Sequence, residues 1–149
     1  MSKEKIQISD LKLVKNVLSY SIFDVNNTID FSEWYKTNDL EIKLESEFAI
    51  KKNDNSSAKL SLTLELFDTE FREENKPFYL KVKMNFLFID TEGFYDEKNN
   101  VIEKFNLNMV SIAYPYLRSY VSTITAISGM EQIHIPTINV FKTLVKKED

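Results

Sequence analysis

Two segments of the sequence decide the expected fold: Tyr114-Pro-Tyr-Leu-Arg-Ser-Tyr-Val-Ser-Thr-Ile-Thr-Ala-Ile-Ser-Gly129 and Ile135-Pro-Thr-Ile-Asn139. Proline is favoured in the first turn of a helix, because the N–H that it lacks would have no partner there. Glycine is favoured just beyond the last turn, because it adopts a left-handed conformation without strain. The first segment therefore predicts a helix from about residue 113 to residue 128, opened by Pro115 and closed by Gly129.

Apolar side chains recur along this predicted helix with helical spacing, and two further ones widen the apolar stripe. A stripe this wide exceeds what one sheet can cover, so we expect a partner subunit to cover part of it. The expected interface residues are Tyr116, Tyr120, Val121, Ile124 and Ile127. Beyond Pro136, Asn139 can cap a short last helix that carries Phe141 and Leu144 on its apolar side.

Upstream of the helix, apolar and polar residues alternate with a period of two, which is typical of strands that bury one face. The predicted strands lie within residues 6–25, 40–50, 60–66 and 78–88. The predicted turns and loops lie at residues 53–57, 72–76 and 90–100. An aromatic but irregular segment, residues 29–38, connects the first two strands.

This order of elements predicts an α+β fold, in which a four-stranded antiparallel sheet is followed by one long and one short C-terminal helix. The length of 149 residues fits a single domain, with only residues 1–5 expected to be loose. A net charge of −4 is unfavourable for nucleic-acid binding. No apolar run approaches the roughly 20 residues that span a bilayer, and we expect neither membrane insertion nor a signal peptide.

Little in the composition points to chemistry. Cysteine is absent and His134 is the only histidine, so neither a thiolate metal site nor a catalytic triad is expected. Only two glycines occur, too few for most phosphate-binding loops. We therefore expect no enzyme activity, no cofactor and no metal. The lack of cysteine agrees with a reducing cytoplasm, where we expect the protein to be located.

The predicted long helix and the segment after it resemble the SecB family of export chaperones. The similar motifs are Pro115-Tyr116-x-Arg118, then Val121-Ser122 and Ile124, the closing Gly129, and Ile135-Pro136-Thr137-Ile138-Asn139. Glu33-Trp34 is similar to an acidic-Trp pair that ends the family's crossover before the second strand. The order of elements matches over most of the chain, whereas the specific motifs are confined to residues 114–139.

The resemblance implies a homotetramer, a dimer of dimers in which the long helices pack between two sheets. It also implies an ATP-independent chaperone that holds unfolded polypeptides, including preproteins for export, in apolar grooves. The residues implied to line those grooves are Phe31, Trp34, Tyr35, Leu40, Ile42, Leu44, Phe141 and Leu144. A narrower role is also open, because some SecB-like proteins serve one dedicated partner such as an antitoxin.

One partner of the family conflicts with this sequence. Typical members carry carboxylates on the outer face of the first strand, where the translocation ATPase SecA docks. Here the stretch from Leu11 to Phe23 contains Lys12, Lys15 and Asn16 and no acidic residue, which argues against SecA as a partner.

Two groups of residues each allow a second interpretation. The crossover aromatics Phe31, Trp34 and Tyr35 either plug the end of the core or line an open groove. Aromatic side chains suit a promiscuous groove, because they offer large contact areas to varied sequences. The carboxylates of the second strand are either a solvated face or a ladder that docks a basic tail. They are Asp39, Glu41, Glu45 and Glu47.

Overall fold

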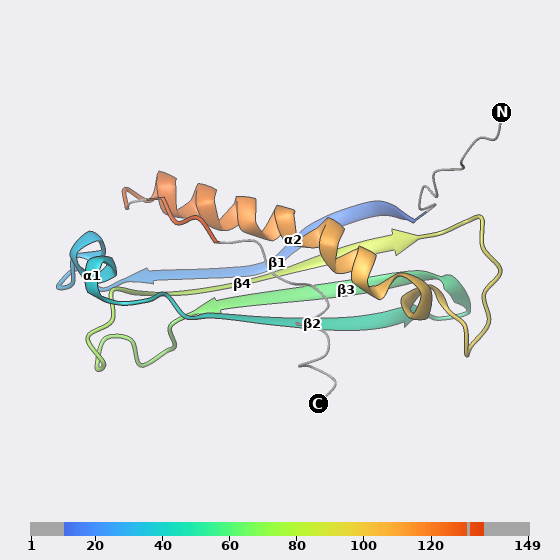
Figure 1. Cartoon of the computed structure of the whole chain (residues 1–149), viewed down its shortest axis with the longest axis horizontal. Helices are drawn as coiled ribbons and strands as arrows, with labels where there is room; N and C mark the ends of the chain where they lie inside the picture. The colour runs from blue at the N-terminus through green and yellow to red at the C-terminus, as the bar shows by residue number, and fades with distance from the viewer. Residues whose placement is uncertain (1–10, 131, 136–149) are drawn as a thin grey trace.

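The computed structural model describes residues 11–130 and 132–135. Its elements are β1 (Lys12–Val25), α1 (Phe31–Thr37), β2 (Ile42–Lys51), β3 (Asp54–Leu66), β4 (Phe78–Ile89) and α2 (Val101–Ile127). The strands form one antiparallel sheet in the order β1-β4-β3-β2, so β1 and β2 are its edges. α2 lies across one face of the sheet, and α1 lies at one end of it (Figure 1). The predicted sheet followed by a long helix is confirmed, while the predicted short last helix lies outside the described residues.

The core lies between the sheet and α2, and the two central strands supply most of it. The inward side chains of β3, Ala58, Leu60, Leu62, Leu64 and Leu66, are completely buried. Every second residue of β4 from Phe78 to Phe88 is likewise buried on the same face. Full burial of a leucine or phenylalanine side chain contributes about 1.5–3 kcal/mol, so these alternating residues anchor the fold.

β1 breaks the alternation that the other strands follow. Its register against β4 shifts between Leu13 and Lys15 and again between Leu18 and Tyr20. Each extra residue in such a bulge reverses which of the following side chains face α2. For this reason the period-two pattern cannot be followed along β1. Which of its side chains face α2 is decided by the register of β1 against β4.

The predicted start of the long helix, near residue 113, is wrong, because α2 begins at Val101. The side chain of Asn100 caps it by accepting a hydrogen bond from the N–H of Glu103 at 3.0 Å. Pro115 does not open the helix but lies inside it on an exposed side, where the lost backbone hydrogen bond can be replaced by water. The predicted closure is confirmed, since Gly129 follows the last turn with a φ of +85°.

Two predicted connections also differ from the structure. The segment between β1 and β2 is not irregular throughout, because α1 forms within it. Asp30 caps α1, and its carboxylate accepts hydrogen bonds from the N–H groups of Ser32 at 2.9 Å and Glu33 at 3.4 Å. The predicted turn at 53–57 is shorter, because β3 begins at Asp54 and Asn53 makes the tight turn with a φ of +63°.

Candidate functional site

Aromatic rings meet at the end of the sheet where α1 lies. Phe78, at the start of β4, is the centre, with ring centroids of Phe23, Phe31 and Phe67 at 5.7, 5.4 and 4.9 Å. Trp34 lies 5.2 Å from Phe67, and most of these pairs meet edge to face, as aromatic rings prefer. The aromatic cluster comprises Phe23, Phe31, Trp34, Tyr35, Phe67 and Phe78.

α1 gives its three aromatic side chains different roles. Phe31 packs on Phe78, so the interpretation that the crossover plugs the end of the core is in part correct. Trp34 is half-buried and packs on Phe67, a residue whose left-handed backbone, with a φ of +63°, is uncommon for an aromatic. Tyr35 contacts Phe31 with ring centroids 5.4 Å apart, yet its residue surface is 51% exposed. Tyr35 is therefore exposed enough to contact a ligand, whereas Phe31 packs beneath it and holds it in place.

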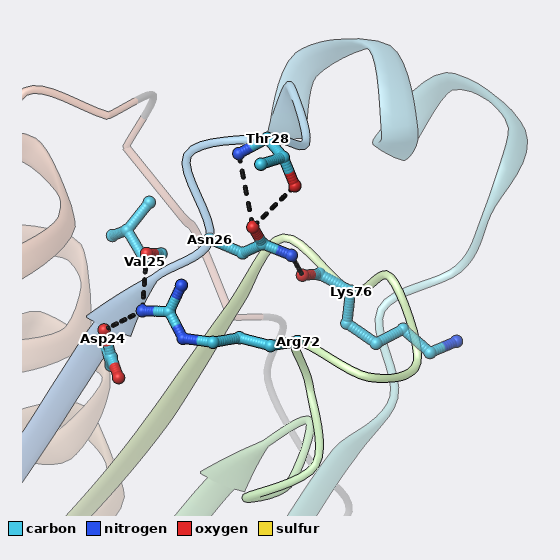
Figure 2. A network of polar contacts seen from close by, with 6 residues as sticks. All are labelled: Asp24, Val25, Asn26, Thr28, Arg72 and Lys76. Carbon is cyan, nitrogen blue, oxygen red and sulfur yellow. Dashed lines mark hydrogen bonds and ion pairs between the residues drawn. The ribbon is translucent and has the colours of Figure 1, made fainter.

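Polar contacts join the end of β1 and the turn before α1 to the loop between β3 and β4 (Figure 2). The buried Asn26 donates from its side chain to the carbonyl of Lys76 at 3.1 Å, and its oxygen accepts from the hydroxyl of Thr28 at 2.7 Å. The guanidinium of Arg72 pairs with Asp24 at 2.7 Å and donates to the carbonyl of Val25 at 3.2 Å. The network joins the end of β1 to this loop and thereby positions the aromatic cluster.

An apolar hollow opens on one side of α1. It has a volume of about 480 Å³, within the roughly 300–1,000 Å³ that ligand sites usually span. Its lining is Phe31, Ser32, Tyr35 and Lys36 from α1, with Gln132, Ile133 and His134 from the segment after α2. The ammonium group of Lys36 pairs with Glu33 at 3.0 Å. On the α1 side, the exposed Tyr35 supplies the open aromatic surface, and the partly buried Phe31 supports it.

Two hydroxyl groups of α2 hold the far wall of the apolar hollow. The buried Thr125 accepts a hydrogen bond from the N–H of Ile133 at 2.9 Å, and Ser122 donates to the Ile133 carbonyl at 3.0 Å. Both polar groups of the Ile133 backbone are thus paired with α2 side chains. The segment after α2 is thereby folded back over the helix, with Gln132 and His134 exposed on either side.

An acidic hollow lies on the other side of α1. Its volume is about 420 Å³, and its lining is Trp34, Asp39, Glu41, Lys43, Phe67, Asp68, Glu74 and Lys76. Four carboxylates and two lysines share it, so the hollow carries net negative charge around two aromatic rings. α1 is the partition between the two hollows, with Tyr35 on the apolar side and Trp34 on the acidic side.

The remaining predicted groove residues lie elsewhere or outside the described part of the chain. Leu40, Ile42 and Leu44 are partly buried and pack against the core, and they line neither hollow. Phe141 and Leu144 fall among the residues that the structure does not describe. The assignment of all these residues to a groove stays a prediction.

The predicted interface residues of α2 have unequal surfaces. Ile127 is 79% exposed and Tyr116 is 45% exposed, while Tyr120 and Ile124 are partly buried. Val121 is completely buried within its own chain, so it packs in the core and has no surface to offer a second copy.

Only part of the lining of the two hollows could be predicted from the sequence, namely Phe31, Trp34, Tyr35, Asp39 and Glu41. Gln132 and Ile133 carry no signal of their own, and His134 was expected to be only structural, whereas it is exposed and lines the apolar hollow. Phe67 follows the alternating leucines of β3 and reads as one more strand residue. The hydroxyl positions Ser122 and Thr125, which lie three apart near the helix end, were the available signal for a chain that folds back.

Within the described residues, no three histidine, aspartate or glutamate side chains are placed so that they could hold one metal ion, the carboxylates of the acidic hollow included. Within residues 11–130 and 132–135, no helix is both long and apolar enough to cross a membrane. The two hollows beside α1 are lined by aromatic rings, carboxylates and lysines.

Comparison with solved structures relates the fold to a chaperone. No family model matches the sequence, and no sequence match to a curated protein was found. The SecB-like chaperone Rv1957 of Mycobacterium tuberculosis, solved with a ChAD peptide from the Rv1956 HigA1 antitoxin, aligns with a TM-score of 0.57. The identity is 16%, over 87% of this chain and 88% of that one. A protein of unknown function from Streptococcus agalactiae aligns with a TM-score of 0.47 and 8% identity, over 85% of this chain and 97% of that one. The chain is similar to the first of these in fold, and its fold is SecB-like.

Proposed function

We propose that this protein is an ATP-independent chaperone that holds unfolded polypeptide segments, here called clients, in the hollows beside α1. The observation that carries the proposal is the apolar hollow, in which Tyr35 is half-exposed yet held by ring contact to Phe31. A binding surface that is already ordered loses little conformational entropy when a client arrives. The SecB-like fold supports the same function, which we extend to protein export in the cytoplasm.

Clients of varied sequence can be held by two unspecific forces. Burial of apolar client surface against Tyr35 and Phe31 contributes about 25 cal/mol per Å². β2 is an edge strand of the described sheet, and the backbone groups on its outer edge, which pair with no other described strand, can add an extended client segment as a further strand. Neither force depends strongly on client sequence, as a general holding function requires.

The test is light-scattering mass of the protein alone, with a reduced and slowly folding client, and with the same client in its folded state. We expect a stable complex with the unfolded client only. A protein that ignores every unfolded client would exclude general holding and leave a dedicated partner.

The second candidate function is service to one dedicated partner, such as an antitoxin. The observation that favours it is the peptide bound to Rv1957, which comes from the HigA1 antitoxin. A dedicated chaperone would bind one extended peptide tightly and discriminate against scrambled versions of that peptide. A general chaperone would bind both with similar affinity, so calorimetry with the two peptides separates the candidates.

We further propose that the chains assemble through α2 into a homotetramer, a dimer of dimers. Tyr116 and Ile127 supply exposed apolar surface on α2, 45% and 79% exposed, although the Tyr116 ring also meets Phe86 of β4 with ring centroids 6.1 Å apart. Ile124 is partly buried against the core. Replacement of Ile127 and Tyr116 by aspartate should reduce the light-scattering mass by at least half. An unchanged mass would show that α2 does not join the copies.

A further inference from the structure

The face of the sheet opposite α2 has an uneven distribution of charge. Directly opposed residues of an antiparallel pair share a face, so the register assigns Tyr20 with Lys83, and Ile22 with Lys81, to this outer face. Val17 lies on the same face opposite Asn85. The β1–β4 outer surface is defined here as the part of this face that β1 and β4 form.

Positive charge on the β1–β4 outer surface is not balanced locally. It carries Lys12, Lys15, Lys81 and Lys83, which form no ion pair within the described part of the chain. Its one carboxylate, Asp24, is already paired with Arg72 at 2.7 Å. The chain as a whole has a net charge of −4, so the four lysines stand out against an acidic protein.

The neighbouring carboxylate on β3 is also engaged. Glu65 lies opposite Lys81 in the register but accepts a hydrogen bond from the hydroxyl of Tyr79 at 2.7 Å. Burial of Tyr79, and then this hydrogen bond, raise the pKa of Tyr79 to about 12, so the phenol stays a neutral donor. Glu65 is held toward Tyr79, and the ammonium groups of Lys81 and Lys83 remain available to a partner.

Three apolar side chains run beside these lysines in a row along β1. Val17, Tyr20 and Ile22 are 42%, 38% and 44% exposed. The solvent-exposed face of an edge strand normally carries polar side chains, among which lysine is common. A row of three apolar side chains on such a face is unusual. The combination of an apolar row with an adjacent row of unpaired lysines is typical of a surface that another chain covers.

We propose that the β1–β4 outer surface docks an acidic protein segment whose apolar side chains lie on Val17, Tyr20 and Ile22 while its carboxylates pair with Lys81 and Lys83. The occupant follows from charge complementarity, which sets both the orientation and the rate of association. On the β2–β3 side of the same face, Glu45, Glu47 and Glu65 offset Lys43 and Lys59, so positive charge is in excess only on the β1–β4 side. An acidic segment is therefore expected on the β1–β4 side. This site is separate from the hollows beside α1 and does not depend on the proposed holding function.

The test uses a synthetic peptide in which glutamate and leucine alternate, with fluorescence anisotropy as the readout. We expect the peptide to bind the wild-type protein, and the affinity to fall with added salt, because surface charges are screened. The double variant Lys81→Glu with Lys83→Glu should weaken binding by about tenfold or more. The matched control is Lys52→Glu with Lys98→Glu, which makes the same change of charge at exposed positions away from this surface and should leave binding unchanged.

Three outcomes would overturn the proposal. The first is an acidic peptide that fails to bind the wild-type protein or binds both double variants equally. The second is tighter binding of a single-stranded oligonucleotide than of the peptide, which would assign the lysines to nucleic acid. The third is a change of light-scattering mass in Lys81→Glu with Lys83→Glu alone, which would make the surface a contact between copies of this chain. Capture of unfolded client by this variant should equal that of the wild type.

Discussion

The two hollows beside α1 are nearly equal in volume, about 480 and 420 Å³, and opposite in character. One presents Tyr35, Phe31 and Ile133, while the other surrounds Trp34 and Phe67 with four carboxylates and two lysines. A single two-turn helix separates them. The difference shows that adjacent aromatic positions on one short helix can serve two surfaces, because residues 34 and 35 point to different sides of it.

The two hollows should also differ in what they contribute to binding. Apolar burial acts on any client that has exposed hydrophobic side chains, and salt does not screen it as it screens charges. Charged side chains at an exposed surface contribute little affinity individually, but they favour partners of the opposite charge. We therefore expect the apolar hollow to supply most of the affinity and the acidic hollow to select among clients.

The largest effect is expected from Phe78→Ala, which removes the ring that supports both hollows. Phe78 is completely buried and contacts Phe23, Phe31 and Phe67, and truncation of such a side chain costs about 3–5 kcal/mol. Urea denaturation should show this loss of unfolding free energy. The milder Phe78→Leu keeps the chain folded and should still impair client capture. Normal capture by Phe78→Leu would contradict the role of the aromatic cluster.

The next effect separates the hollows directly. Tyr35→Ser should weaken client binding by about tenfold, because an aromatic anchor at the centre of a binding site typically contributes more than 1 kcal/mol. Phe94, which is fully exposed on the loop before α2, provides the matched control, and Phe94→Ser should bind clients normally. Calorimetry measures the client affinity of both variants. If Tyr35→Ser bound the client as tightly as the wild type does, the apolar hollow would not be the main source of affinity.

A smaller effect is expected where α2 holds the wall of the apolar hollow. Thr125→Val keeps the side-chain shape but leaves the buried N–H of Ile133 without its acceptor, which costs about 1–3 kcal/mol. Hydrogen exchange at the Ile133 amide should rise more than exchange at the β3 amides. Equal protection in variant and wild type would show that Thr125 does not fix the wall.

The smallest effect is expected in the acidic hollow. Asp39→Asn with Glu41→Gln should change the affinity for a neutral, apolar client by less than about threefold, because exposed charges contribute roughly 0–1 kcal/mol. The same variant should lose affinity for a lysine-rich client, most clearly at low salt. A large loss with the neutral client would mean that the acidic hollow, and not the apolar one, dominates capture.

The sheet and the end of α2 could be predicted from the sequence, because their signals are local. Alternate leucines in β3 define its buried face, and Gly129 marks the helix end. The start of α2 was missed although Asn100 and Glu103 form a capping signal, because Pro115 offered a more familiar helix start. Bulges in β1 erase its period, so no pattern in the sequence could orient that strand.

The candidate site could be predicted only in part, because it is built from residues distant in sequence. The aromatic character of residues 31–35 was visible, and Trp34 and Tyr35 do line hollows. The pairing of Ile133 with Ser122 and Thr125, and the left-handed Phe67 between Trp34 and Phe78, arise from tertiary packing. Periodicity within one element contains no information about such contacts.

Photo-crosslinking shows directly whether unfolded clients contact the apolar hollow beside α1. A photoreactive phenylalanine analogue is placed at position 35 in one sample and at position 94 in another, and each is mixed with the same unfolded client. We expect crosslinks to the client from position 35 and few or none from position 94. Equal crosslinking from both positions, or crosslinking from position 94 alone, would contradict the claim that clients are held in the hollow beside α1.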